Sequence, residues 1–150
     1  MIFKDEKQLK NFLMEKCKVA VIRTQNKIYE IIKKALAEFY QDYDPVLYER
    51  TYQLMQSLVK SDIRRVGSGY QAEVYFDLSG INYATGNMPT GEQVMKAASH
   101  GLHGAIGSDL LYMHGDTGVD VWNTPMQEID ARAISMLVQE LKAQGIPIKK

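Results

Sequence analysis

The sequence contains a single cysteine, Cys17, only four prolines and only three histidines among its 150 residues. One cysteine excludes an internal disulfide framework, so stability has to come from packing. Cys17 lies among residues with helical periodicity, which favours a packed thiol over a nucleophile. No stretch approaches the roughly 20 apolar residues of a membrane-spanning helix, and the opening residues lack the apolar run of a signal peptide. We therefore expect a soluble chain with no membrane partner.

The sequence also lacks an excess of charge of either sign, because 18 Lys and Arg residues balance 18 Asp and Glu residues. Such a balance provides no overall field for holding nucleic acid or an anionic membrane surface. The charges are nevertheless unevenly placed. Residues 1–40 hold nine basic and five acidic residues, a net charge of +4, whereas residues 41–150 hold nine and thirteen, a net charge of −4. Chance solvation explains this split, and so do subunits that pack a basic end against an acidic neighbour.

With 45% hydrophobic and 24% charged residues, the composition is that of a folded chain, and its length fits one domain over residues 1–150. No Pro or Gly occurs between Asp5 and Asp42, which predicts a long helix over residues 1–42. About 35 residues at 1.5 Å each form a rod of roughly 50 Å, longer than a domain of this size is wide. Either the rod projects and needs a partner, or it breaks at residues 17–22, which are rich in β-branched side chains. The expected apolar stripe comprises Leu9, Phe12, Leu13, Ala20, Thr24, Ile28, Ile31, Ile32, Ala35, Leu36 and Phe39.

Residues 43–78 are predicted to form an elbow and a β hairpin. The helix should end at "YDP", because the residue before a proline avoids the α region. Asp44 can cap, and Pro45 can begin, a short second helix through "VLYERTYQLMQSLVK". The stretch "SDIRRVGSGYQAEVYFDLSG" then indicates two strands around residues 67–69. On the second strand we expect one face to carry Tyr70, Ala72, Val74 and Phe76, and the other to carry Gln71, Glu73, Tyr75 and Asp77.

Residues 79–124 hold most of the glycines and all three histidines, and we expect a loop-rich insertion with one short helix at "GEQVMKAASHGL". A closing helix is predicted over residues 125–145. Thr124 is its expected cap, Pro125 its first residue and Gln127 the partner in a capping box, and Gly145 followed by Pro147 should end it. Its expected buried stripe comprises Met126, Ile129, Ala133, Leu137 and Leu141.

Three histidines, His100, His103 and His114, form the one constellation that suggests a metal, with Asp109 or Asp116 as a further ligand. A small metal-dependent hydrolase is therefore an alternative function. The glycine-flanked H-x-x-H spacing, however, lacks the helical histidine pair and the glutamate of a metallopeptidase. We favour polar loop residues, no metal and no catalytic site.

A basic group, Lys60, Arg64 and Arg65, lies near Tyr70 and Tyr75 in the predicted hairpin. Contact with DNA or with another subunit is one interpretation, and an ordinary solvated strand face is the other. A phage regulatory protein that binds DNA or a host protein is thus a further alternative.

The stretch "YDPVLYERTYQLMQSL" combines rings that can bury at a corner with a guanidinium that can hold carbonyl or carboxylate oxygens. We interpret it as a structural elbow and subunit contact formed by Tyr43, Pro45, Tyr48, Arg50, Thr51, Tyr52, Leu54 and Ser57. The segment resembles the head-tail joining or tail-completion (neck) proteins of tailed phages and prophages. Better-known members carry "P-x-x-T-G-x-L-x-x-S" where this chain has "YERTYQLMQSL". Thr51, Leu54 and Ser57 fit that pattern, and Tyr52 stands where the family has glycine.

The resemblance implies an α+β fold, with a long N-terminal helix and a C-terminal helix packed on a small antiparallel sheet. It also implies a homo-oligomeric ring around the DNA-exit channel, without cofactor or catalysis. The implied partners are other phage connector and tail-tube proteins, with non-specific contact to DNA in the channel. The expected place is the head-tail junction of the virion, after synthesis in the cytoplasm of the bacterial host.

Overall fold

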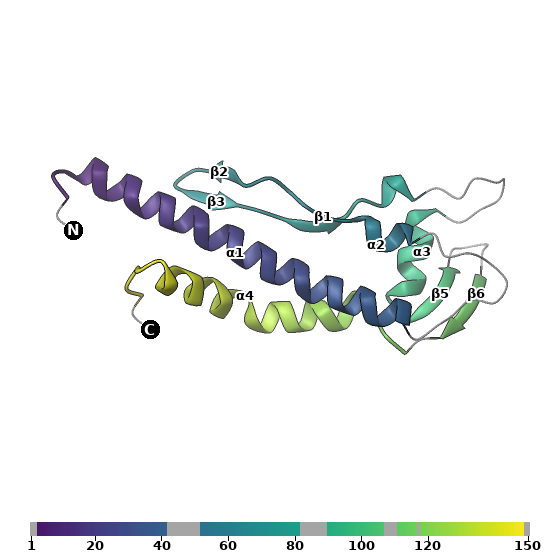
Figure 1. Cartoon of the computed structure of the whole chain (residues 1–150). Coiled ribbons are helices and arrows are strands. Elements are labelled where there is room, and N and C mark those ends of the chain that lie inside the picture. Colours follow the sequence, from purple (N-terminus) through teal and green to yellow (C-terminus); the bar gives the residue numbers. More distant parts are fainter. Residues whose placement is uncertain (1–2, 42–51, 82–89, 107–110, 117, 149–150) are drawn as a thin grey trace.

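Two long helices, α1 (Glu6–Gln41) and α4 (Asn123–Ala143), lie side by side, and a narrow β ribbon runs along α1 (Figure 1). The computed structural model describes residues 3–41, 52–81, 90–106, 111–116 and 118–148, and for Ala105 and residues 111–116 it describes the backbone alone. The shorter elements lie around the C-terminal end of α1: α2 (Gln53–Gln56), the 3₁₀ helix η1 (Leu78–Gly80), α3 (Gly91–Ala98), β5 (Leu102–Ile106) and β6 (Leu111–Asp116). The predicted α+β class, with long N-terminal and C-terminal helices and small antiparallel sheets, is confirmed.

Helix α1 is continuous over 36 residues, which corresponds to about 54 Å at 1.5 Å per residue. The break suggested for residues 17–22 was wrong. β-branched residues lower helix propensity by only a few tenths of a kcal/mol each, and residues 17–22 are all partly or fully buried, so packing offsets that cost. The C-terminal two thirds of α1 supply its buried residues, which include Ala20, Ile32, Leu36 and Phe39.

The β ribbon consists of β1 (Leu58–Lys60), β2 (Arg64–Val66), β3 (Gly69–Gln71) and β4 (Val74–Phe76). Strand β1 pairs with β4, and β2 pairs with β3, both antiparallel. Gly67, at φ +58°, makes the tight turn at the tip. The predicted hairpin and its two faces are confirmed: residues 70, 72, 74 and 76 are half-buried toward α1, and residues 71, 73, 75 and 77 are exposed.

Helix α2 is a single turn, so the prediction that helix continues through Lys60 was wrong. The helix ends at Gln56 with Ser57 as its C-cap, and Leu58 begins a strand. The reason is a tertiary contact, because the Asp77 N–H donates to the Ser57 carbonyl at 2.7 Å and starts the β1–β4 ladder there. Asp44, the proposed cap, and Pro45, the proposed first residue of the second helix, lie outside the described residues.

The insertion at residues 79–124 is more regular than expected. Helix α3 occupies the predicted place, with a capping box between Thr90 and Gln93. The prediction of only loop around it was wrong, since β5 and β6 form a second hairpin. A bulge between His103 and Gly104 interrupts its register, and this hides the period of two in the sequence. Gly91 lies so close to η1 that a Cβ atom there would be 2.4 Å from the Leu78 carbonyl oxygen.

Helix α4 is capped by Asp120, and the prediction of Thr124 was wrong. The Asp120 carboxylate accepts hydrogen bonds from the N–H groups of Trp122 at 2.7 Å, Asn123 at 2.8 Å and Thr124 at 2.9 Å. Burial raises the pKa of Asp120, but these hydrogen bonds lower it by more, so the net pKa lies below its ordinary value. The capping side chain lies four residues before the expected position because Thr124 is already inside the first turn.

The core lies between the C-terminal half of α1, the start of α4 and the short elements around them. Its buried cluster comprises Ile32, Leu36, Phe39, Leu54, Leu58, Ile81, Val94, Ala98, Val121 and Ile129. On α4 the expected stripe is confirmed, since Ile129 is buried and residues 126, 133, 137 and 141 are half-buried. Met136 and Glu140 are buried in addition. Among the helices that the structure describes, none combines the length and apolarity required to cross a bilayer.

Candidate interaction surfaces

The first turns of α1 form an overhang, which we define as residues 6–17. Figure 1 shows α1 running past the tip of the ribbon and past the end of α4. Leu9 and Leu13 are 39% and 38% exposed, although they continue the apolar stripe that is buried further along α1. Two large apolar side chains on one helix face therefore lack the cover that the rest of the stripe has.

Residues beside the overhang give it a defined shape. The ring of Phe12 contacts that of Phe3 at 5.2 Å between centroids, and the Lys16 ammonium lies 5.4 Å from the Phe12 ring centroid. A surface hollow of ≈ 470 Å³ extends along the helix to Ser68 at the ribbon tip. Its lining comprises Glu6, Leu9, Lys10, Leu13, Met14, Cys17 and Ser68. Cys17 is a partly buried thiol in this hollow, in agreement with its interpretation as a packing residue.

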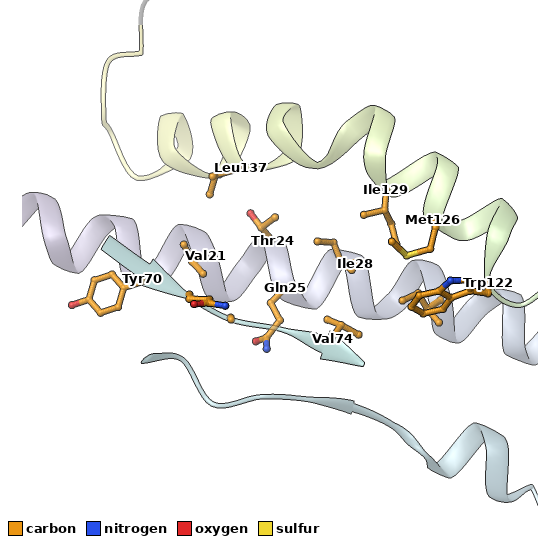
Figure 2. Close-up of a pocket in the computed structure, with 13 residues that line it drawn as sticks. Val21, Thr24, Gln25, Ile28, Tyr70, Val74, Trp122, Met126, Ile129 and Leu137 are labelled. Atoms are coloured by element: carbon orange, nitrogen blue, oxygen red, sulfur yellow. The ribbon is translucent and has the colours of Figure 1, made fainter. Parts of the chain in front are cut away.

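A second depression, which we call the groove, lies between α4 and strands β3 and β4, with α1 as its floor (Figure 2). It measures ≈ 420 Å³. Figure 2 shows Met126, Ile129 and Leu137 directed from α4 toward α1, and Trp122 at one end. The remaining lining residues are Val21, Thr24, Gln25, Ile28, Ile32, Tyr70, Gln71, Ala72 and Val74. The groove is mainly apolar and is bounded by an open strand on one side and a helix on the other.

Gln25 fastens the ribbon to α1 beneath this groove. The side chain is only 8% exposed, and its Nε2 donates to the carbonyl oxygens of Ser61 and Glu73, both at 2.9 Å. The role of Gln25 was not predicted from the sequence. Its position between the apolar Val21 and Ile28 was the available signal, because a polar residue within a buried stripe requires partners.

Glu140 connects α4 to α1 and was also missed. Its carboxylate lies 2.6 Å from the Lys27 ammonium and 3.6 Å from the Arg23 guanidinium. The hydrogen bond from Lys27 lowers the pKa of Glu140 most, and although desolvation raises it, the charges of both cations bring the net pKa below its ordinary value. The contact fixes the end of α4 alongside the middle of α1, which leaves the overhang beyond it.

Of the predicted elbow residues, Tyr43, Pro45, Tyr48, Arg50 and Thr51 lie outside the described residues. The other three are placed as follows. Tyr52 has a positive φ of 53° and its ring lies 5.0 Å from that of Tyr40, Leu54 is buried in the core, and the Ser57 hydroxyl donates to the Leu54 carbonyl at 2.8 Å. These three residues pack at the turn that leads into β1, and the interpretation of residues 43–57 as an elbow and subunit contact stays a prediction. A residue at positive φ also explains why a glycine would be suitable at position 52.

Each of the predicted basic residues of the ribbon contacts another residue of the same chain. Arg64 forms an ion pair with Glu73 at 2.8 Å, and the Arg65 Nε donates to the Gly67 carbonyl at 3.4 Å. Lys60 donates to the Asn26 side chain at 2.9 Å and lies 4.9 Å from the Tyr29 ring centroid. Each of the three side chains thus has a partner within the chain.

Two members of the predicted histidine constellation, His100 and His103, bind different elements of the chain. His100 is exposed, and its Nδ1 donates to the Lys96 carbonyl of α3 at 2.8 Å. His103 is buried, and its Nε2 donates to the Phe39 carbonyl at the end of α1 at 3.0 Å. The side chains of His114 and Asp116 and all of Asp109 lie outside the described part. Among the residues that the structure describes, no three His, Cys, Asp or Glu side chains come together as metal ligands would.

The chain is similar to a known protein family. A family model described as YomN matches residues 5–143, nearly the whole chain. The chain belongs to the YomN family. YomN is a gene name from a Bacillus prophage region, so this YomN-family chain is associated with phage or prophage. The comparisons with curated proteins and with solved structures found no match.

The YomN match spans α1, the ribbon, the insertion and α4, so it concerns the whole arrangement of elements and not one motif. It agrees with the phage or prophage origin implied by the resemblance of residues 43–58. It does not by itself assign the YomN-family protein a place in a phage particle.

Proposed function

We propose that this chain is a structural virion protein of a tailed phage or prophage, a ring-forming neck or tail-completion component at the head-tail junction. The observation that carries the proposal is the overhang of α1 with its exposed Leu9 and Leu13. Apolar side chains in a row on a projecting helix favour a protein partner, and a closed ring provides that partner from identical copies.

The charge distribution supports contact between unlike surfaces of neighbouring copies. Lys4, Lys7, Lys10, Lys16 and Lys18 lie on or beside the overhang, together with Asp5, Glu6 and Glu15, for a net charge of +2 (five minus three) over residues 4–18. Two overhangs packed on each other would bring like charges together. A head-to-tail arrangement, in which the overhang meets a different and more acidic surface, avoids that repulsion and closes into rings.

Such a role uses no cofactor and no catalysis. The partners in the particle would be connector and tail-tube proteins above and below the ring, and DNA would pass through the channel without sequence-specific contact. The protein would be made in the cytoplasm of the bacterial host and then become part of the virion.

Substitution of the overhang tests the proposal. The variant Leu9→Asp/Leu13→Asp should lose ring formation, measured by light scattering and electron microscopy with connector and tail-tube proteins present. Ile134→Asp is the matched control, because Ile134 is 80% exposed on α4, away from the overhang. We expect it to assemble like the wild type. A wild-type chain that stays monomeric with those partners present would contradict the proposal, as would a doubly substituted chain that still forms rings.

DNA binding is measured separately from assembly. If the chain were a regulatory DNA-binding protein, duplex binding would fall steeply with salt and would be lost in Arg64→Ala/Arg65→Ala. We expect at most weak binding that these substitutions change little, because Arg64 is already paired with Glu73.

A further inference from the structure

We propose that the groove between α4 and strands β3 and β4 binds an extended segment of a partner protein as an added antiparallel strand, with a basic residue at the segment's first position. The inference goes beyond the neck role and does not depend on it, since it concerns a peptide-binding site within one copy of the chain.

The backbone groups of β4 point alternately to its two edges. The Glu73 carbonyl accepts from Ser61 N–H at 2.9 Å, and Asp77 N–H donates to the Ser57 carbonyl at 2.7 Å, so residues 73 and 77 face β1. Backbone groups alternate along a strand of an antiparallel pair. Val74 and Phe76 therefore direct their N–H and C=O groups to the opposite edge. Within the described chain, no hydrogen bond reaches these groups from another element.

The open edge borders the groove. Tyr70, Ala72 and Val74 line it from the strand side, whereas none of its lining residues comes from β1 or β2. An added strand would satisfy the unpaired groups of Val74 and Phe76 and would lie above the apolar floor of α1. A helix or a small apolar molecule would fill the space but leave those groups without partners.

The groove also selects the side chains of its occupant. In an antiparallel pair, directly opposite residues point to the same face. The side chains of Val74 and Phe76 point toward α1, so every second residue of the added strand would do the same and should be apolar. Tyr70 to Phe76 spans seven residues, about 23 Å at 3.3 Å each, which sets the length of the segment.

Charge at the Trp122 end gives the segment its direction. The rings of Phe76 and Trp122 are 5.9 Å apart, so Asp77, next to Phe76, and Asp120, two residues before Trp122, both lie near this end. The pKa of Asp120 is below its ordinary value, so its carboxylate is ionised at neutral pH. An antiparallel segment enters with its N-terminal side here, and a lysine or arginine at its first position would face two carboxylates.

A designed peptide provides the probe. The octapeptide KVTVTVTV, with a free amino terminus and an amidated carboxyl end, has the required length and alternation: its lysine lies opposite Asp77, and its valines lie opposite Phe76, Val74, Ala72 and Tyr70 and point toward α1. Trp122 is the single tryptophan of the chain and lines the groove, so its fluorescence reports binding directly. We expect saturable binding by the full chain, and binding about tenfold weaker for the reversed peptide VTVTVTVK with both ends blocked. Absence of binding up to about 1 mM, or equal binding of the two peptides, would overturn the proposal.

Two proline variants locate the binding edge. Val74→Pro removes an N–H from the groove edge without removing a β1–β4 hydrogen bond, and should weaken peptide binding about tenfold. Lys60→Pro is the matched control, because Lys60 directs its N–H to the other edge of the same ribbon; it should bind like the wild type. Hydrogen exchange on the wild-type protein is independent of either variant. The peptide should slow exchange of the Val74 and Phe76 amides and leave that of Lys60 unchanged, and protection of Lys60 alone would refute the site.

Discussion

Replacement of Gln25 by alanine should weaken the attachment of the ribbon to α1 and lower the free energy of unfolding, although Gln25 is far from any turn or terminus. Its Nε2 donates to two carbonyl oxygens of the ribbon, those of Ser61 and Glu73. The Glu73 carbonyl keeps its bond from the Ser61 N–H, whereas the Ser61 carbonyl loses its donor from Gln25. Loss of two hydrogen bonds of about 1 kcal/mol each, one of which leaves an acceptor unsatisfied in a part-buried place, gives a cost of about 2–3 kcal/mol.

This cost is a large part of the roughly 5–15 kcal/mol by which domains are stable. For a chain of this size it corresponds to a fall in Tm of about 5–10 °C. Thermal and urea unfolding followed by circular dichroism would measure it. The matched control is Asn26→Ala, since Asn26 is the next residue, is exposed, and accepts only a surface hydrogen bond from Lys60. We expect this control to cost less than about 1 kcal/mol.

A second substitution distinguishes the hydrogen bonds from the loss of side-chain volume. Gln25→Glu keeps the size but presents a carboxylate to the two carbonyl oxygens, so the folded-state pKa of the new carboxyl should be raised. A carboxyl group whose pKa is raised in the folded state destabilises the fold at pH values above that folded-state pKa. This destabilisation disappears as the pH falls and the carboxyl group becomes protonated. The variant should therefore be less stable at pH 7 than at pH 4 relative to the wild type. If Gln25→Ala costs no more than Asn26→Ala, the proposed role of Gln25 is wrong.

Three further predictions concern other contacts. Lys27 lowers the folded-state pKa of Glu140, so the ion pair stabilises the fold above the unfolded-state pKa near 4.5, and this stabilisation is lost as pH falls through the lower folded-state pKa. Below pH 4.5 the Tm of the wild type should therefore fall more than the Tm of Glu140→Gln. Parallel curves of Tm against pH for the two proteins would contradict this prediction. Gly91→Ala should destabilise by about 1–3 kcal/mol in urea unfolding because its Cβ would overlap η1, whereas Gly80→Ala, which has open space around it, should cost less than about 1 kcal/mol. His103→Ala should cost about 1–3 kcal/mol because a buried carbonyl of α1 loses its donor, and a loss below about 0.5 kcal/mol would show that the bond is dispensable.

Local patterns were sufficient where one segment determines its own conformation. The absence of Pro and Gly from residues 6–41 and the apolar spacing predicted α1, and the period of two around Gly67 predicted the hairpin with the correct inner face. Gly145 ended α4 as expected, at φ +81°. These features depend on backbone sterics and on the repeat of apolar side chains, both of which a sequence displays directly.

Other features were decided by residues far apart in the chain. Leu58–Lys60 is a strand because Ser57 pairs with Asp77, and β5–β6 forms although its glycines and bulge hide the alternation. His100 and His103 are close in sequence but have different partners: the His100 ring binds a carbonyl of α3, and the His103 ring binds a carbonyl of α1. The exposed overhang required both kinds of information. The sequence alone determined that α1 is a long amphipathic helix, and only the tertiary structure decided which part of its apolar stripe is covered, because burial depends on where the Glu140 and Gln25 contacts place α4 and the ribbon.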